Sequence, residues 1–359
     1  MNNSNEFDYI VVGQGLAGSA LSYQILKAGK RVLVIDDNRP VTSSKVAAGL
    51  YNPVTGRKMV KTWKADTLFP YLISFYKELE ELCGDQFLIE RSIYRPFLSM
   101  EEQNEWMGKS ASEEFEHFIT KVHHRSQYAF STDDYGGIEL NMSGYLDIPR
   151  YLKAYRSYLE SKKIMLSAKF DHKLLKPGSD AVVYRGYSTK KIIFCNGLDA
   201  FHNTHFDWLP FQPVKGEVLQ IKTEIQLEHI LNRGVFVIPI EDDVFKVGSN
   251  YDNKDHTMGI TSKAREEITM KLKELVNVPF EVVDQIAGVR PATKDRRPFI
   301  GLHPEYETIG IFSGLGTKGV SLAPYFSGHF IDFLEHGKEL YPEVNISRYF
   351  SLYYDSLKN

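Results

Sequence analysis

Three glycines near the amino terminus have the spacing of a phosphate-binding turn. Gly13, Gly15 and Gly18 form a Gly-x-Gly-x-x-Gly pattern directly after the apolar, β-branched run 9–12. In such a turn the first glycine permits the sharp bend, the second lets the backbone approach a pyrophosphate, and the third allows close packing of helix on strand. The helix that follows directs its free N–H groups and its positive dipole end at the phosphates. The pattern therefore predicts a dinucleotide-binding site.

Acidic residues end the next predicted strand. A helical pattern at 19–28 is followed by the predicted strand 31–35, which is apolar from residue 32 onward, and then by Asp36 and Asp37. A carboxylate at this point can accept hydrogen bonds from ribose hydroxyls and disfavours a 2′-phosphate, so NADP is not expected. This strand–turn–helix–strand context distinguishes the site from a glycine-rich turn that binds nothing, which is the alternative interpretation.

The fingerprint alone does not separate FAD from NAD. Only one such fingerprint is present, and a flavoprotein that also used a nicotinamide cofactor would often carry a second. The glycine-rich segment 314–319 lacks the required spacing, and no acid-ended strand follows it. The sequence therefore favours FAD as the cofactor.

Composition excludes several other classes of protein. The 43 basic and 46 acidic residues give a net charge of −3, whereas a dedicated nucleic-acid-binding domain is usually strongly basic. The two cysteines, Cys83 and Cys195, form no disulfide framework. No apolar run is long enough to span a membrane, and we expect a cytoplasmic protein. Two histidine pairs, at 123 and 124 and at 202 and 205, lack the cysteine or carboxylate neighbours of a metal site, so no metal is expected.

The order of predicted elements indicates an α/β protein. Strands and helices alternate without a repeat or an obvious linker, so the two domains should be interleaved in sequence. We expect a Rossmann-like FAD-binding domain from residues 1–60, 141–205 and 285–359. A second, α+β substrate domain with a mixed sheet is expected from 61–140 and 206–284. The main predicted helices are 67–82, 100–119, 150–161 and 262–276, and the main further strands are 164–170, 190–195, 214–222, 234–240, 244–247 and 309–312.

Four segments, in order along the chain, carry a resemblance to a known family. They are 9–36; the Ser/Ala/Gly-rich run 43–50; the strand 191–197 that ends in Asn-Gly; and 287–301 together with 314–320 and Ala323-Pro324. These segments resemble the family of D-amino-acid oxidase, glycine oxidase and monomeric sarcosine oxidase. They also resemble the oxidoreductase half of the bifunctional enzyme that matures tRNA wobble uridine. The stretch from about 60 to 140 matches this family poorly.

The resemblance implies a set of FAD contacts. Backbone amides of the last glycine-rich turn would face the flavin pyrimidine oxygen, where a helix N-terminus stabilises the negative charge that develops on reduction. No cysteine lies near Lys294 or Lys318 to tether the flavin, so the FAD should be bound non-covalently. The implied contact residues are Gly13, Gly15, Leu16, Ala17, Gly18, Asp36, Asp37, Ser43, Ser44, Ala47, Ala48, Gly49, Leu50, Phe170, Cys195, Asn196, Gly197, Arg290, Gly314, Leu315, Gly316, Lys318, Gly319 and Val320.

Two residues are the predicted catalytic groups. At the position of Arg290, the resemblance implies an arginine that pairs with the substrate carboxylate, for which the guanidinium fork is well suited. A structural salt bridge with Asp284 or Asp295 is the alternative. At Lys246 the resemblance implies a lysine near flavin N5 that assists oxygen reduction. Strand alternation gives an equal alternative, in which Lys246 points to solvent.

Some positions depart from the family. Phe236 replaces a substrate-contacting tyrosine of glycine oxidase, and Thr317 replaces its second arginine. Asn250 stands where sarcosine oxidase has a histidine. These departures argue against glycine and sarcosine themselves as the substrates.

The predicted activity is oxidation of a C–N bond in a small amino acid or secondary amine. Hydride would pass to flavin N5, and the imine would then hydrolyse, with oxygen or another acceptor reoxidising the flavin. One alternative is an oxidase of carboxymethylaminomethyl uridine in tRNA; the turn 316–319 favours it, and the acidic composition and missing methyltransferase half do not. A basic funnel around the flavin would support that alternative. The other alternative is a non-catalytic FAD-binding protein, for which a blocked flavin face would be the sign. The sequence does not indicate the oligomeric state.

Overall fold

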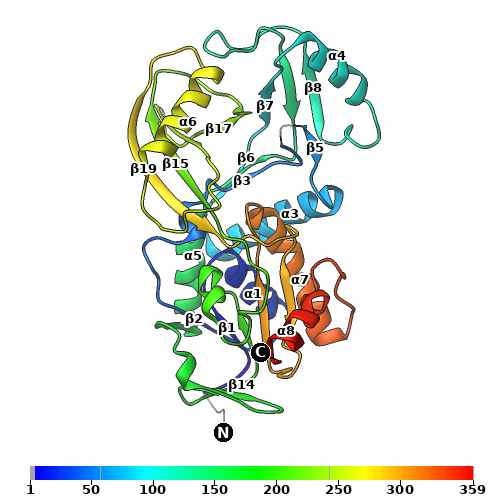
Figure 1. Cartoon of the computed structure of the whole chain (residues 1–359), viewed down its shortest axis with the longest axis vertical. Coiled ribbons are helices and arrows are strands. Elements are labelled where there is room, and N and C mark those ends of the chain that lie inside the picture. Colours follow the sequence, from blue (N-terminus) through cyan, green and yellow to red (C-terminus); the bar gives the residue numbers. More distant parts are fainter. Residues whose placement is uncertain (1–4, 57, 242, 359) are drawn as a thin grey trace.

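The computed structural model consists of two lobes stacked along the long axis of the molecule (Figure 1). It describes residues 5–56, 58–241 and 243–358. Each lobe is built around an eight-stranded sheet, and the chain passes repeatedly between the two lobes. We call the lobe that carries both chain ends in Figure 1 the lower lobe and the other the upper lobe.

The lower sheet is centred on parallel strands in the order β11-β2-β1-β14-β21, with three antiparallel strands added at its edges. Both faces are buried, because alternate residues of β1 enter two different apolar clusters. Such two-sided burial explains the nearly continuous apolar runs in the sequence. The strands are β1 (Glu6–Val12), β2 (Val32–Asp36), β11 (Met165–Ser167), β12 (Leu175–Pro177), β13 (Val182–Tyr184), β14 (Tyr187–Phe194), β20 (Phe299–Leu302) and β21 (Ile309–Ser313).

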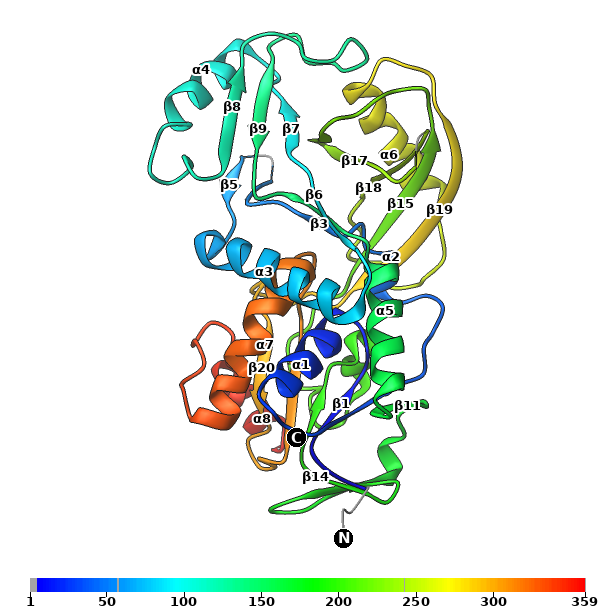
Figure 2. The same cartoon turned by 180° about the vertical axis from the view of Figure 1, so that it is seen from behind.

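Helices cover one face of the lower sheet. Helix α1 packs against α5 and α7, and α3 lies across α5 and α7 at the top of the lower lobe (Figure 2). Helix α5 begins where Asp147 accepts a hydrogen bond from the Arg150 backbone N–H and a proline occupies the first turn. The ranges are α1 (Leu16–Lys27), α3 (Ala65–Cys83), α5 (Ile148–Ser161) and α7 (Gly319–His336).

The upper sheet has the order β19-β15-β18-β17-β16-β7-β9-β8. It is mostly antiparallel, with one parallel contact between β16 and β7. Helix α6 packs on one face over a core that includes Leu219, Val237 and Val247. The elements are β7 (Ile93–Pro96), β8 (Ile119–His123), β9 (Gly137–Leu140), β15 (Val214–Lys222), β16 (Ile230–Arg233), β17 (Val235–Pro239), β18 (Val244–Gly248), β19 (Glu281–Arg290), α4 (Met100–Lys109) and α6 (Ser262–Leu275).

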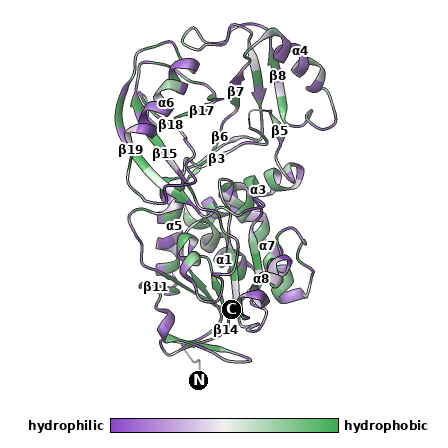
Figure 3. Cartoon of the chain, in the orientation of Figure 1, coloured by the Kyte–Doolittle hydropathy of each residue, from purple (hydrophilic) through white to green (hydrophobic). Residues whose placement is uncertain are grey.

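Short elements connect the lobes and finish the lower lobe. A three-stranded sheet, β3-β10-β6, and the hairpin β4–β5 lie between the lobes. In Figure 3 the outer helices α4 and α6 are largely hydrophilic, whereas α7 is largely hydrophobic, as its burial requires. The remaining elements are α2 (Ser43–Val46), β3 (Leu50–Tyr51), β4 (Val54–Thr55), β5 (Val60–Lys61), β6 (Leu88–Glu90), β10 (Gly144–Leu146), η1 (His172–Leu174), η2 (Gly197–His202), η3 (Ile346–Tyr349) and α8 (Phe350–Ser356).

The predicted α/β fold class, with a Rossmann-like lower lobe and a mixed-sheet upper lobe, is confirmed. The predicted domain boundaries stay a prediction. All strands of the lower sheet fall inside 1–60, 141–205 and 285–359. The strands of the upper sheet fall inside 61–140 and 206–284 except β19, which starts at Glu281 and runs past residue 285.

The predicted helix 100–119 is wrong in length. Helix α4 ends at Lys109, and turns follow it. The hydroxyls of Ser110 and Ser112 donate hydrogen bonds to the carbonyls of Met107 and Lys109. Local bonds of this kind compete with helix continuation. The predicted strand 164–170 is shorter as well, because β11 ends at Ser167.

No helix among the described residues has the length and apolar character needed to cross a membrane.

Candidate functional site

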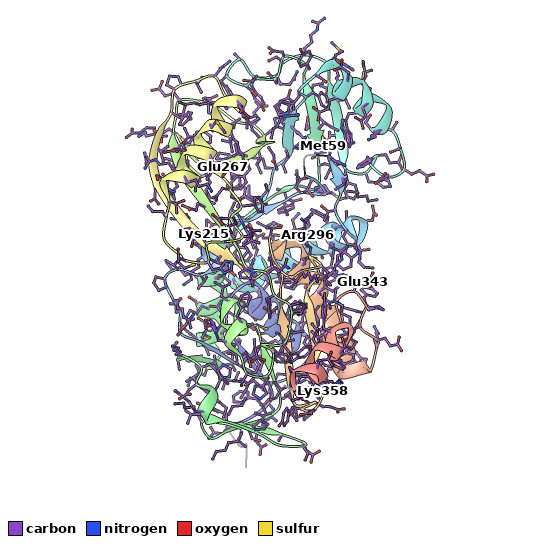
Figure 4. The ribbon with its side chains drawn as sticks, in the orientation of Figure 1. Met59, Lys215, Glu267, Arg296, Glu343 and Lys358 are labelled. Atoms are coloured by element: carbon purple, nitrogen blue, oxygen red, sulfur yellow. The ribbon has the colours of Figure 1, made fainter. Side chains whose placement is uncertain are left out.

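A cavity of about 1700 Å³ lies at the junction of the lobes. Its walls come from the β1–α1 turn, α2, the β21–α7 turn and the face of the upper sheet opposite α6. Arg296 is one of the lining residues, and Figure 4 shows it between the two lobes. We call this space the junction cavity. It exceeds the roughly 300–1,000 Å³ of pockets for drug-sized ligands, so it can hold a large cofactor and a substrate together.

The three glycines of the β1–α1 turn each occupy a position that has no room for a side chain. Gly13 has a φ of +101°, and a Cβ there would lie 2.7 Å from the Cys195 carbonyl oxygen. A Cβ on Gly15 would lie 2.9 Å from Ser44 Oγ, and one on Gly18 only 1.8 Å from the Gly13 oxygen. These contacts agree with the sharp bend, the exposed backbone and the helix–strand packing expected from the sequence.

Two helices direct their N-termini at the junction cavity. Helix α1 starts after Gly15 and α7 after Lys318; neither cap residue bonds the first turn through its own side chain, and neither helix has an acidic residue there. In α1 the Leu16 backbone N–H donates to Ser44 Oγ at 3.2 Å. Both cap residues line the cavity. An uncapped N-terminus presents unsatisfied N–H groups and a positive dipole end, which favours phosphate oxygens and developing negative charge.

Asp36 is fixed at the end of β2, as the sequence predicts for the ribose-binding acid. Its carboxylate accepts hydrogen bonds from the backbone N–H groups of Gln14, at 2.9 Å, and Asn38, at 2.7 Å. Arg156 of α5 adds an ion pair at 3.2 Å. Next to it, Asp37 pairs with Arg39. The carboxylate of Asp36 is therefore oriented at the cavity wall before any ligand arrives.

Buried polar atoms also indicate a ligand in the junction cavity. Asn196 Oδ1, Ser313 Oγ and the Tyr51 hydroxyl are buried without a hydrogen-bond partner among the described residues, and all three residues line the cavity. Leaving such atoms unsatisfied is costly, so each is an available partner for polar atoms of a bound molecule. Together with the glycine turn and the two helix N-termini, they fit FAD in size and in chemistry.

The predicted cofactor residues converge on this one cavity, apart from Gly18. All the others line it, from the turn at 13–17 and the segment 43–50 to the turn at 314–320. Gly18 lies behind the turn, where it packs against Gly13. Whether each lining residue contacts the cofactor stays a prediction.

Arg290, at the end of β19, lies at the cavity wall in a well-defined place. Its Nη1 donates to the Lys215 carbonyl oxygen at 3.3 Å, and its Nη2 donates to Ser249 Oγ at 2.8 Å. The Tyr251 ring covers the guanidinium, with its centroid 4.7 Å from Cζ. Gly216 lies directly beneath, because a Cβ there would be 2.0 Å from Nη2.

No described residue neutralises the charge of Arg290. Its hydrogen-bond acceptors are a carbonyl and a hydroxyl, and it forms no ion pair within the described ranges. Asp295 instead pairs with Arg348, and Asp284 is exposed and accepts from the Gln285 backbone N–H. Burial lowers the pKa of the guanidinium, and the Tyr251 side chain opposes this shift. Three of its five N–H groups remain for an anion.

One row of residues across the upper sheet forms the floor of the cavity. Val218, Gly248, Phe236, Asn232 and Arg95 succeed one another on β15, β18, β17, β16 and β7. All five line the junction cavity. The neighbouring residues on the same strands point to the opposite face, where they form the core under α6.

Lys246 lies on β18, two residues before Gly248, and so faces the same side of the sheet as the floor row. Its strand partner Ile238 belongs to the same apolar cluster as Tyr9 and Val11 of β1. Lys246 is half-buried and is not among the described residues that line the cavity. Burial lowers its pKa. The structure thus places it next to the floor, and its catalytic role stays a prediction.

Lys318 contributes a second half-buried cation to the cavity. Its Nζ donates to Thr62 Oγ1 at 2.8 Å and to Thr55 Oγ1 at 3.2 Å. Burial lowers its pKa to about 8, and the positive charge of Arg297 adds to the effect. Both of these hydrogen-bond acceptors are threonine hydroxyls, so they are neutral, like the acceptors of Arg290.

Sequence reasoning missed several lining residues, namely Arg39, Arg95, Asn232, Arg233, Ser249 and Arg296. Most come from the upper sheet or from loops that reach the cavity only when distant strands pair. Phe236, which the sequence marks as a departure from the family, lies in the floor row. Within the described residues, no group of three His, Cys, Asp or Glu side chains could hold a metal ion.

Comparison with known proteins is consistent with this geometry. The family model described as FAD dependent oxidoreductase matches residues 8–332. Glycine oxidase of Bacillus licheniformis is 23% identical over 357 residues, covering 89% of this chain and 90% of that protein. Glycine oxidase of Pseudomonas putida is 30% identical over 130 residues, but that match spans only about a third of either chain, 35% and 36%.

A third relative is named for a different activity. The tRNA 5-methylaminomethyl-2-thiouridine biosynthesis bifunctional protein MnmC of Legionella pneumophila is 22% identical over 317 residues. The match covers 82% of this chain and 45% of that protein, so this chain spans less than half of the relative's length.

Solved structures share the whole fold. Glycine oxidase from Geobacillus kaustophilus aligns with a TM-score of 0.76 at 19% identity, covering 96% of this chain and 98% of that one. Iminodiacetate oxidase from Chelativorans sp. BNC1 aligns with a TM-score of 0.74 at 17% identity, covering 95% and 98%. The glycine turn, the two helix N-termini and the family match lead to one conclusion: the chain belongs to the DAO family of FAD-dependent oxidoreductases.

Proposed function

We infer that the protein oxidises the C–N bond of an amine that carries a carboxylate. The observation behind this proposal is Arg290, a half-buried guanidinium in the cavity wall whose hydrogen-bond acceptors are a carbonyl and a hydroxyl. Because it has no carboxylate partner among the described residues, a bound carboxylate would supply the missing negative charge and accept the remaining N–H groups. Bound FAD would supply the acceptor for the hydride, which carries both electrons of the oxidation.

The surroundings of Arg290 favour a substrate whose amine is already neutral. The residues that contact its guanidinium include Gly216, Ser249, Tyr251 and the Lys215 backbone. None of these neighbouring groups is a carboxylate or a histidine that could serve as a strong base. As hydride leaves the carbon, the nitrogen lone pair forms the C=N bond, and water then hydrolyses the imine to a carbonyl compound and an amine.

The position of α7 supports the electron-accepting half of the reaction. Its uncapped N-terminus and the cation of Lys318 lie at the same cavity as Arg290. Both favour negative charge, so reduction of a cofactor held there is assisted by fixed dipoles and by a fixed charge.

Replacement of Arg290 tests the proposal with paired substrates. We expect Arg290→Gln to lower kcat/KM for a carboxylated amine by about 100-fold, the equivalent of about 3 kcal/mol for a lost charge-assisted bidentate contact. The same variant should change kcat/KM little for the matching amine that carries a neutral amide. Arg185→Gln, at an exposed turn of the lower lobe, is the charge control. Equal losses on both substrates would rule out the carboxylate contact.

A second candidate function is oxidation of a modified uridine in tRNA. A cluster of cations supports it. Arg296 and Lys318 line the cavity. Close by, Arg297 Cζ lies 4.2 Å from the Trp63 ring centroid, and Lys64 Nζ lies 4.1 Å from the Tyr341 ring centroid. Anaerobic addition of tRNA that carries carboxymethylaminomethyl uridine, against unmodified tRNA, separates the two functions. Flavin reduction by the modified tRNA alone would favour this second candidate.

A further inference from the structure

The floor row extends across the sheet well beyond the residues that contact Arg290. The guanidinium lies over Gly216 of β15 and beside Ser249, which follows β18. From β18 the row crosses β17 and β16 to Arg95 on β7, and every residue in it lines the same cavity. At about 4.8 Å per strand, three strand spacings place the β7 backbone about 14 Å from β18. A glycine-sized substrate would occupy only the near end.

Two arginines stand at the far end of this floor. Arg95 is 9% exposed, and Arg233, at the end of β16, has a side chain that is 14% exposed. Both line the cavity. Because β7 and β16 are parallel neighbours in the sheet, the two arginines approach the cavity from adjacent strands.

One carboxylate supports both guanidinium groups from outside the cavity lining. Glu102 of α4 lies 3.0 Å from Arg233 and 4.0 Å from Arg95, and it is not among the described lining residues. It also accepts a hydrogen bond from the Leu98 backbone N–H. Glu102 therefore orients the arginines, and these three side chains together carry one net positive charge. Arg233 also donates a hydrogen bond from Nη1 to the Pro96 carbonyl oxygen. Asp134 and Glu274 line the cavity as well, but both are exposed, so water screens their charges.

The two arginines repel each other. Burial lowers the pKa of Arg95 to about 10, with Arg233 adding to the decrease and Glu102 opposing it. An anion bound between the guanidinium groups would relieve this repulsion. Arginine suits that task because its planar fork binds carboxylate or phosphate oxygens in pairs.

We propose that Arg95 and Arg233 form an anion subsite for the far end of the substrate. The substrate is then a carboxylated amine whose substituent extends over Phe236 and Asn232 and ends in a second acidic group. This inference rests on the proposed function, because Arg290 holds the near carboxylate. It also gives a physical reason for Phe236: an apolar ring in the floor row suits the aliphatic middle of such a substrate.

Binding of simple dicarboxylates tests the subsite without turnover. The FAD-loaded protein is titrated with α,ω-dicarboxylates from succinate to suberate and with monocarboxylates of equal length, and the visible flavin absorption gives each Kd. We expect one or more of the longer dicarboxylates to bind at least tenfold more tightly than the matching monocarboxylate. Arg95→Gln and Arg233→Gln should each abolish this gain and leave monocarboxylate binding unchanged. Equal affinities for both series, or a gain that survives both substitutions, would overturn the subsite.

Kinetics provides the second test. N-alkylglycines that end in a carboxylate or in a phosphate are compared with the same compounds ending in a neutral amide. We expect Arg233→Gln to lower kcat/KM at least tenfold for the acid-ended compounds only, and the better of the two acids identifies the anion. The double variant Arg95→Gln/Glu102→Gln removes one charge of each sign, so it keeps the test valid if Arg95→Gln alone does not fold. Arg185→Gln serves again as the control.

The two proposals fail in different ways. If Arg290→Gln weakens monocarboxylate binding while Arg95→Gln and Arg233→Gln have no effect on either series, the subsite is wrong and the proposed function stands. If monocarboxylates bind Arg290→Gln as tightly as the wild-type protein, the proposed function fails at its first step.

Discussion

Replacing Gly216 by alanine is a sharp test of how the site is built, because the three atoms nearest to the new methyl group would all belong to the Arg290 side chain. The added Cβ would lie 2.0 Å from Nη2, 2.3 Å from Cζ and 2.4 Å from Nη1. No such contact is tolerated, so the guanidinium must move. Gly216 does not have a positive φ, and the backbone of β15 should therefore accept alanine.

The cost of this displacement follows from the contacts that it breaks. Arg290 would lose its hydrogen bonds to the Lys215 carbonyl and to Ser249 Oγ, and with them the orientation of its remaining donors. A hydrogen bond to a charged group is worth about 1.5–3 kcal/mol, so affinity for a carboxylate should fall by about 10- to 150-fold. The assay is a titration with acetate, followed through the visible absorption of the bound flavin.

A suitable control separates this effect from a general loss of structure. A methyl group added at Gly108 in α4 would have nothing within 4 Å, and Gly108→Ala should leave acetate binding unchanged. The FAD content of Gly216→Ala should match that of the wild-type protein, because the β1–α1 turn and Asp36, which carry the expected pyrophosphate and ribose contacts, belong to the lower lobe. Wild-type acetate affinity in Gly216→Ala would show that Arg290 does not bind the carboxylate in this orientation.

Three further outcomes are expected. Gly15→Val should weaken FAD binding at least tenfold in reconstitution of the apoprotein, because even a Cβ at this position comes within 2.9 Å of Ser44 Oγ; unchanged FAD affinity would argue against the turn as the pyrophosphate site. With a pKa of about 8, Lys318 is charged below that pH and neutral above it. A positive charge near the flavin stabilises the reduced form, so the midpoint potential should fall more between pH 7 and 9 in the wild-type protein than in Lys318→Met. Parallel pH profiles would place Lys318 away from the flavin. Lys215→Met should lower the free energy of unfolding by about 3 kcal/mol in urea titrations, since Lys215 and Glu217 are each 1% exposed and loss of the ammonium would leave the Glu217 carboxylate buried without this cation; a change near zero would mean that the pair contributes no net stability.

The parts of the site that the sequence predicts are those encoded locally. The turn from Gly13 to Gly18 and the acid at Asp36 lie within one strand–helix–strand unit, so spacing alone defines their geometry. Ser44 likewise belongs to a segment that its own residue types mark as a cofactor contact, although its hydrogen bond from the Leu16 backbone N–H depends on the fold.

The floor of the cavity could not be predicted in this way. Its five members lie between Arg95 and Gly248 in the sequence and become neighbours only through the register of five strands, one pair of which is parallel. A one-residue shift in any of these pairings would turn a lining residue to the opposite face. Alternation along β18 likewise leaves two possible faces for Lys246, and only the pairing of β18 with its neighbours resolves which face it takes.

The ion-pair partners of individual charged residues could not be predicted from the sequence either. Proximity in the sequence makes Asp295 a possible partner of Arg290, yet it pairs with Arg348 from the C-terminal segment at 2.9 Å. That choice depends on how the C-terminal residues pack on the lower sheet, which no local pattern encodes.

The most direct test of the central claim is anaerobic mixing of the FAD-loaded protein with a panel of carboxylated amines and their neutral amide counterparts. The proposed function predicts that at least one carboxylated amine bleaches the visible flavin absorption and that its amide does so far less effectively. If no amine in the panel reduces the flavin, or if the amides reduce it as well as the acids do, oxidation of a carboxylated amine is not the activity of this protein.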